Sequence, residues 1–159
     1  HPSRAGHVLV FSQTMELIQH FEAHSEFVSS IVTLNGKIIT CSWDSTIKIW
    51  NVQREGASAN AASTSGQAQG PVSMSVSLET TLDTHHARVT SLVLSNNRLI
   101  SCSDDNTLIV WDISKEKGAM LEKRMLGAWG GAIYSLQAAH DKVVSCSHKE
   151  GRVTLWSLS

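Results

Sequence analysis

Histidine, hydroxyl and aspartate side chains recur together in this sequence, and these residue types can form a base, a nucleophile and an orienting acid. His24, Thr40 and Asp44 are followed, 61 residues further along in each case, by His85, Ser101 and Asp105. Neither set lies in a GxSxG nucleophile turn, and the chain has no glycine-rich phosphate loop. A set that occurs twice at equivalent positions favours an architectural role, so we expect no catalytic residue and no enzyme activity.

Eight histidines and three cysteines raise the separate question of a metal site. His85 and His86 are adjacent, so their side chains would point apart in a strand. Cys41, Cys102 and Cys146 occupy the same position in three separate repeats. Neither pattern has the spacing of residues that bind one metal ion. We therefore expect no metal and no cofactor. Three equivalent cysteines predict three buried free thiols and a reducing compartment, so the expected location is intracellular, cytoplasmic or nuclear.

The cysteines mark an internal repeat. "CSWDSTIKIW" ends at Trp50, "CSDDNTLIVW" at Trp111 and "CSHKEGRVTLW" at Trp156. The units begin at His24, His85 and Trp129, and the second has the length of roughly 40 to 45 residues that is typical of a propeller blade. The first is about 17 residues longer. Its excess at about 53–73 is rich in Ala, Ser, Gly and Gln, which predicts a disordered insertion between strands.

Short β-branched runs bounded by turn residues predict four strands in each full unit, at 28–34, 37–42, 46–52 and 75–82 in the first. Residues 6–12 align with the end of the last unit. We therefore expect one all-β domain over 1–159. Its parts are the end of a preceding blade at 7–22, a blade at 24–82, a blade at 85–127, and a last blade at 129–158 that lacks its outer strand.

This pattern resembles the WD40-repeat β-propeller family. The resemblance implies a hydrogen-bonded tetrad in each blade: His24, Thr40, Asp44 and Trp50, then His85, Ser101, Asp105 and Trp111. The third unit retains Ser145 and Trp156, but Trp129 stands in place of the histidine and only Glu150 is near the place of the aspartate. The expected fold is a WD40-type propeller of about three full blades plus part of a fourth, as the C-terminal part of a longer ring.

The resemblance also implies an interaction surface on the loop face, formed by the residue before each tetrad aspartate and those three and five after the histidine. These positions are Phe27, Ser29 and Trp43, then Arg88, Thr90 and Asp104, and finally Ala132, Tyr134 and His148. Trp43 is either a binding hot spot or a cover for Phe27. Arg88 either pairs with a phosphate or carboxylate of a partner, or forms a salt bridge with Asp104.

Composition restricts the class of partner. A net charge of −1 with scattered basic residues gives no reason to expect nucleic acid, and no apolar stretch approaches the roughly 20 residues of a membrane span. We expect a non-catalytic scaffold that binds peptide segments or partner subunits on its loop face. Recognition of phosphorylated or otherwise modified peptides, as in the substrate-receptor arm of a ubiquitin-ligase complex, is the alternative. The remainder of the propeller, or self-association, is expected at the open blade edges.

Overall fold

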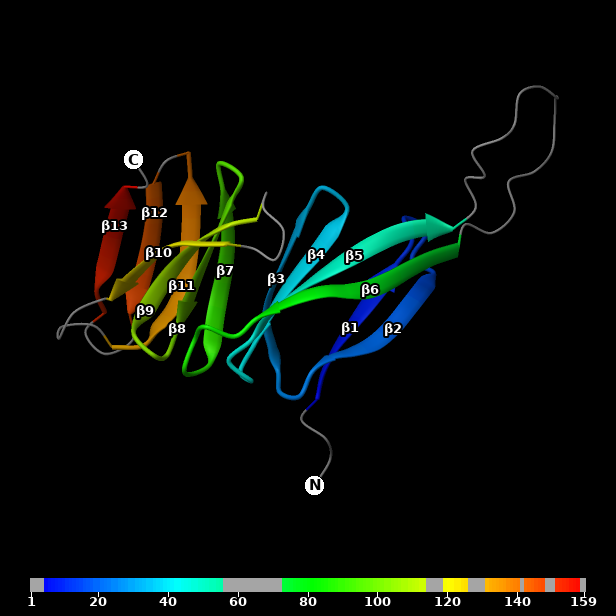
Figure 1. Cartoon of the computed structure of the whole chain (residues 1–159), viewed down its shortest axis with the longest axis horizontal. Helices are drawn as coiled ribbons and strands as arrows, with labels where there is room; N and C mark the ends of the chain where they lie inside the picture. The colour runs from blue at the N-terminus through cyan, green and yellow to red at the C-terminus, as the bar shows by residue number, and fades with distance from the viewer. Residues whose placement is uncertain are drawn as a thin grey trace.

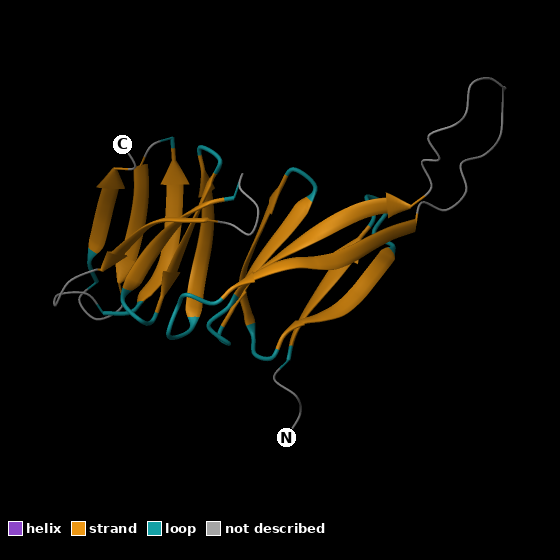
Figure 2. Cartoon of the chain, viewed as in Figure 1, coloured by secondary structure: helices purple, strands orange, loops and turns teal. Residues whose placement is uncertain are grey.

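The computed structural model describes residues 5–55, 73–113, 119–125, 131–140, 142–147 and 151–157. Within these ranges the chain is all-β (Figure 2) and contains no helix that could span a membrane. The strands are β1 (Gly6–Phe11), β2 (Leu17–His24), β3 (Val28–Leu34), β4 (Lys37–Ser42), β5 (Ile47–Glu55), β6 (Ser73–Leu82), β7 (Val89–Ser95), β8 (Arg98–Ser103), β9 (Thr107–Asp112), β10 (Ala119–Met125), β11 (Ile133–Ala139), β12 (Lys142–Ser147) and β13 (Val153–Ser157).

The strands form four antiparallel sheets that stand side by side in an open arc (Figure 1). Two sheets have four strands, in the orders β3-β4-β5-β6 and β10-β9-β8-β7. They are flanked by the two-stranded sheet β1-β2 and the three-stranded sheet β11-β12-β13, which lie at opposite ends of the arc. The predicted fold class is therefore confirmed: two four-stranded sheets lie between a two-stranded sheet and a three-stranded sheet.

Turn chemistry sets the register of the two central sheets. The β3–β4 hairpin turns at Asn35 and Gly36, with φ of 50° and 75°, and the β7–β8 hairpin turns at Asn96 and Asn97, with φ of 47° and 62°. Two successive left-handed residues are what a two-residue hairpin turn requires, and Asn and Gly tolerate that conformation best. The alternating residues that follow can then face the two neighbouring sheets.

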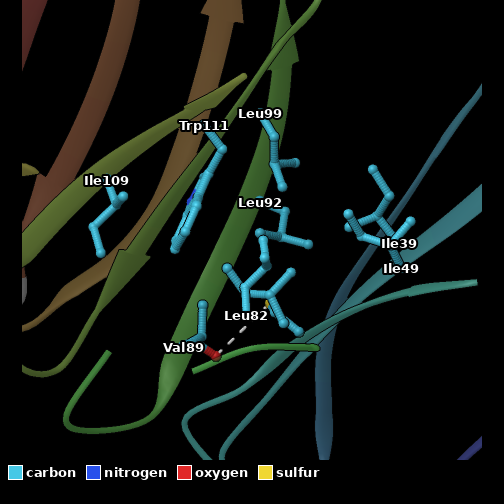
Figure 3. Close-up of a cluster of buried hydrophobic side chains, with 10 residues drawn as sticks. Ile39, Ile49, Leu82, Val89, Leu92, Leu99, Ile109 and Trp111 are labelled. Carbon is cyan, nitrogen blue, oxygen red and sulfur yellow. Dashed lines mark hydrogen bonds between the residues drawn. The ribbon is translucent and has the colours of Figure 1, made fainter. Parts of the chain in front are cut away.

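The hydrophobic core lies between the sheets. Figure 3 shows the cluster between the two four-stranded sheets, where Ile39 and Ile49 meet Leu92, Ile109 and Trp111. A second cluster joins β7–β9 to β11–β13, and a third joins β1–β2 to β3–β6. Each sheet is therefore stabilised by the sheet or sheets that pack on it, since one sheet alone cannot bury its faces.

Two details differ from the prediction. Strands β5 and β6 extend to Glu55 and Ser73, so both ends of the expected insertion are strand, and 56–72 lie outside the described residues. All three cysteines are free, but only Cys41 and Cys102 are buried. Cys146 is half-buried, because no described sheet follows the one that carries it.

Candidate interaction surface

Two hydrogen-bonded tetrads occupy the central sheets. In the first, the His24 imidazole lies 2.9 Å from Asp44 Oδ2 through Nδ1 and 2.8 Å from Thr40 Oγ1 through Nε2, and the Trp50 indole N–H donates to the same hydroxyl at 2.9 Å. The second tetrad has the same arrangement. His85 Nδ1 lies 3.1 Å from Asp105 Oδ2 and His85 Nε2 lies 2.7 Å from Ser101 Oγ, and the Trp111 indole N–H donates to Ser101 Oγ at 2.9 Å.

The donors and acceptors fix the direction of the first tetrad. An ionised carboxylate only accepts and an indole N–H only donates, so His24 donates from Nδ1 to Asp44 and accepts at Nε2 from Thr40.

Burial lowers the pKa of His24, although Asp44 partly opposes this shift. Burial also acts to raise the pKa of Asp44, but hydrogen bonds from Thr46 and the neighbouring His24 outweigh it and hold that pKa below its ordinary value. A neutral imidazole beside an ionised carboxylate satisfies every group.

The second tetrad has the connectivity of a serine hydrolase triad, but it is closed to substrate. The Ser101 side chain is fully buried, and its oxygen already accepts a hydrogen bond from Trp111. The Thr40 hydroxyl of the first tetrad is equally buried. An open hollow is lined by His24 and Asp44 but not by Thr40. The arrangement holds each turn to its sheet and offers no nucleophile at a surface.

The last sheet keeps part of this network. Trp156 donates from its indole N–H to Ser145 Oγ at 3.0 Å. Trp129 and Glu150, which stand near the histidine and aspartate places in the sequence, lie outside the described residues.

The loop face is organised by a repeated pair of hydrogen bonds. Trp43 N donates to Phe27 O at 3.0 Å, and Asp104 N donates to Arg88 O at 2.9 Å. Beside each, a serine hydroxyl also bridges the two loops: Ser42 donates to Glu26 O at 3.2 Å and Ser103 to Ala87 O at 3.1 Å. In both full blades, the loop before the first strand is thus fixed against the turn after the second.

Three of the predicted surface residues form one cluster, which we call the loop-face cluster: Phe27, Trp43 and Arg88. The Phe27 and Trp43 rings meet edge to face with centroids 5.2 Å apart, and the Arg88 guanidinium lies 4.3 Å from the Trp43 ring centroid. Phe27 remains 48% exposed and Trp43 39% exposed. The Arg88 contact crosses from one blade to the next, and neither sequence alternative for Arg88 included it.

Asp104 does not pair with Arg88. No described residue forms an ion pair with either side chain; His24–Asp44, Lys37–Glu79 and His85–Asp105, for example, are pairs of other residues. The Asp104 Oδ1 atom is buried and has no hydrogen-bond partner there. The charge of Arg88 is therefore not neutralised by a described carboxylate, and the guanidinium is held by the indole instead.

Ser29 and Thr90, two of the predicted surface residues, form hydrogen bonds between neighbouring sheets. The Ser29 hydroxyl donates to Val89 O, and the Thr90 hydroxyl donates to Ile133 O; each acceptor begins the first strand of the following sheet. Both side chains also contact the carbonyl and thiol of the cysteine in their own sheet. Both side chains are half-buried and connect neighbouring sheets, and their role in partner binding stays a prediction. The spacing of these residues from the histidine in the sequence does not show that a backbone carbonyl of the next sheet lies beside each hydroxyl.

Of the remaining predicted surface residues, Tyr134 is 52% exposed at the start of β11, and Ala132 is half-buried just before it. His148 lies outside the described residues. The structure therefore brings together Phe27, Trp43, Arg88 and the backbone of Asp104, and leaves Tyr134 on the neighbouring sheet.

The family described as "WD domain, G-beta repeat" matches the chain at residues 15–51 and 76–112. Each matched segment runs from the outer strand of one sheet through three strands of the next. Comparison with curated proteins gives no significant match.

Several solved structures share the fold at low sequence identity. The computationally designed Ika4 protein is 23% identical with a TM-score of 0.69, over 97% of this chain and 81% of that chain. The WD40 β-propeller domain of Doa1 is 21% identical with a TM-score of 0.62, over 90% of this chain and 40% of that chain. The RRP9 WD40 repeats are 15% identical with a TM-score of 0.70, over 96% and 42%. This chain thus spans about two fifths of the Doa1 and RRP9 chains.

The side-by-side antiparallel sheets define the class of the protein as a β-propeller fold in the form of an open arc. The two matched segments identify the repeats: this chain contains WD40 repeats. WD40 propellers are generally non-catalytic protein-interaction scaffolds.

Proposed function

We propose that this chain is a protein-interaction scaffold that binds a peptide segment of a partner at the loop-face cluster. The observation that supports this proposal is the exposure of two aromatic rings and a cation at one point of a rigid surface. Trp, Tyr and Arg are the residues most enriched in binding hot spots. Rings that are already held in place lose little conformational entropy when a partner covers them.

The cluster favours a particular partner chemistry. The aromatic pair presents an apolar surface to an aliphatic or aromatic side chain of the peptide. Arg88 is aligned by stacking on Trp43 and forms no ion pair among the described residues, so its N–H groups can bind a carboxylate or a phosphate. A peptide that carries an apolar residue beside an acidic or phosphorylated one fits both features.

The experiment is selection of random linear peptides by the immobilised full chain, followed by titration calorimetry of the best peptides. We expect Trp43→Ala to weaken binding by at least about tenfold, because it removes the centre of the cluster. Leu78→Ala is the matched control, since Leu78 is similarly exposed at 49% but lies on the outer strand β6. Equal affinity of the native chain and Trp43→Ala for every selected peptide would contradict the proposal.

The role of Arg88 is tested with the same peptides in unmodified and phosphorylated forms. If Arg88 binds phosphate, phosphorylation tightens binding to the native chain, and Arg88→Ala abolishes this gain. If it binds a carboxylate, unmodified acidic peptides bind as well, and Arg88→Ala weakens these. Binding by Arg88→Ala equal to native binding for both forms would assign recognition to the aromatic pair alone.

A further inference from the structure

The sheet β7–β10 repeats the loop-face geometry of the sheet β3–β6 with different side chains. The turn after the second strand carries Trp43 in the sheet β3–β6 and Asp104 in the sheet β7–β10, and the backbone N–H of each donates to the residue before the first strand of its own sheet. Trp43 is met by a cation, since Arg88 reaches it from the following sheet and lies 4.3 Å from its ring centroid. The repeat therefore shows one complete contact between a turn residue and the next sheet.

Neighbouring sheets are placed against each other in the same way at both positions. Ser29 donates to Val89 O of the sheet β7–β10, and Thr90 donates to Ile133 O of the sheet β11–β13. Both acceptors are the first residue of the first strand of their sheet. The sheet β11–β13 thus lies beside Asp104 as the sheet β7–β10 lies beside Trp43.

The residue immediately before each of these acceptors is Arg88 in one sheet and Ala132 in the next. The loop that carries it is held equally in both, because the serine that ends the second strand donates to the carbonyl one residue earlier at 3.1 Å. Ala132 therefore has, relative to Asp104, the place that Arg88 has relative to Trp43. Its side chain is a single methyl group, so the neighbouring sheet brings no cation to Asp104 from this position.

The turn that contains Asp104 has acceptors without donors. Asp104 Oδ1 and Asn106 Oδ1 are both enclosed, and neither has a hydrogen-bond partner among the described residues. An enclosed acceptor without a donor costs free energy, and the cost is larger for a charged group. Asp104 as a residue is only half-buried, and the torsion that exchanges its two carboxylate oxygens is a soft one. The turn can therefore accept a donor that arrives from outside.

We infer that the partner supplies this donor as a basic side chain, which takes at Asp104 the place that the Arg88 guanidinium takes at Trp43. Arginine fits best, because its fork of N–H groups can serve the Asp104 carboxylate and the Asn106 carbonyl together. The inference rests on the proposed function, since it extends the same peptide surface to the next blade. The peptide then carries a basic residue besides the apolar residue and the acidic or phosphorylated residue that bind the loop-face cluster.

The first test is parallel selection of random linear peptides by the immobilised native chain and by Asp104→Asn, which removes the charge and keeps the shape. We expect arginine and lysine to be enriched over the unselected library with the native chain but not with Asp104→Asn. Glu16→Gln is the control: it removes the same charge from the exposed turn between β1 and β2, and should keep the enrichment. Absence of basic enrichment with the native chain, or equal enrichment with Asp104→Asn, would overturn the inference.

Titration calorimetry then compares one selected peptide with a version that has citrulline, a neutral residue of the same shape, in place of arginine. The replacement should weaken binding to the native chain by about fivefold or more, and binding to Asp104→Asn much less. An equal loss for both chains would show that the arginine binds elsewhere. Peptides unaffected by Trp43→Ala contradict the proposed function, whereas peptides that need Trp43 but bind equally with arginine and citrulline overturn this inference alone.

Thermal melting separates a binding role of Asp104 from a structural one. Asp104→Asn should melt at or above the temperature of the native chain, because Oδ1 has no hydrogen bond to lose among the described residues. A lower melting temperature of Asp104→Asn would assign the carboxylate to the stability of the turn and contradict its assignment to the partner.

Discussion

Each tetrad is a one-directional chain of hydrogen bonds that runs from an indole through a hydroxyl and an imidazole to a carboxylate. Thr40 and Ser101 are interchangeable in it because only the hydroxyl is used, once as donor and once as acceptor. The carboxylate also accepts from the backbone: Asp44 from Ser25 and Thr46, and Asp105 from His86 and Thr107. The same acid thus fixes both loops of the loop face.

Asp105→Asn should lower the free energy of unfolding by about 2 kcal/mol, because a buried ionised acceptor of several hydrogen bonds becomes a neutral amide with fewer acceptor sites. Asp83→Asn makes the same chemical change at an exposed aspartate and should alter stability little. Urea unfolding at neutral pH measures both variants. Equal midpoints for Asp105→Asn and the native chain would show that the tetrad carboxylate does not stabilise the turn.

The stability of the chain should fall on acidification in two stages. The pKa of His24 is lowered from 6.5 by burial, so the unfolded chain binds this proton more readily and stability decreases as the pH falls below 6.5. The pKa of Asp105 is lowered from 3.8 to about 2, since hydrogen bonds from Thr107 and His86, with the neighbouring His85, outweigh the effect of burial. Its contribution is present above pH 3.8 and is lost as the pH falls towards 2.

Thermal melting between pH 7.5 and 5.5 isolates the histidine stage. His24→Gln cannot take up the proton, so its melting temperature should depend less on pH than that of the native chain. His86→Gln, at an exposed histidine, should retain the native dependence. A native melting temperature that is constant over this range would contradict the assignment.

At the scale of the elements, the strands could be predicted from the repeated β-branched runs and turn residues, and the tetrads from the resemblance to the WD40 family. β3 and β4 have the predicted bounds, since β-branched runs end at Asn-Gly and at the tetrad turn. The contact of Arg88 with Trp43 could not be predicted, because the place of a long side chain in the loop before β7 does not say which neighbouring blade it reaches. The hydrogen bonds from the Ser29 and Thr90 hydroxyls to the next sheet could not be predicted for the same reason.

Docking of the first sheet depends on Gly6. A Cβ there would lie 2.3 Å from Glu26 O and 2.8 Å from Val28 Cγ2, so the backbone of β1 approaches the next blade more closely than any side chain allows. Gly6→Ala should cost about 1–3 kcal/mol and speed hydrogen exchange in β1 and β2 but not in β8 and β9. His7→Ala, the next residue on the strand and exposed, is the control. Unchanged exchange in β1 for Gly6→Ala would show that the sheet accommodates the methyl group.

At the scale of the whole molecule, a row of sheets presents two kinds of surface. The loop face is rigid because two tetrads fix its loops, and it carries the exposed aromatic pair with its cation. The sheet faces are apolar and covered in the middle of the row, but exposed at its ends.

The most direct test of the loop-face proposal is the indole N–H spectrum of the native chain, titrated with the tightest selected peptide. We predict that the Trp43 signal shifts in proportion to peptide bound, because this ring is the exposed centre of the loop-face cluster. Trp50 and Trp111 are only 7% and 2% exposed within the tetrads, and their signals should stay in place. A bound peptide that leaves the Trp43 signal unmoved would contradict binding at the loop face.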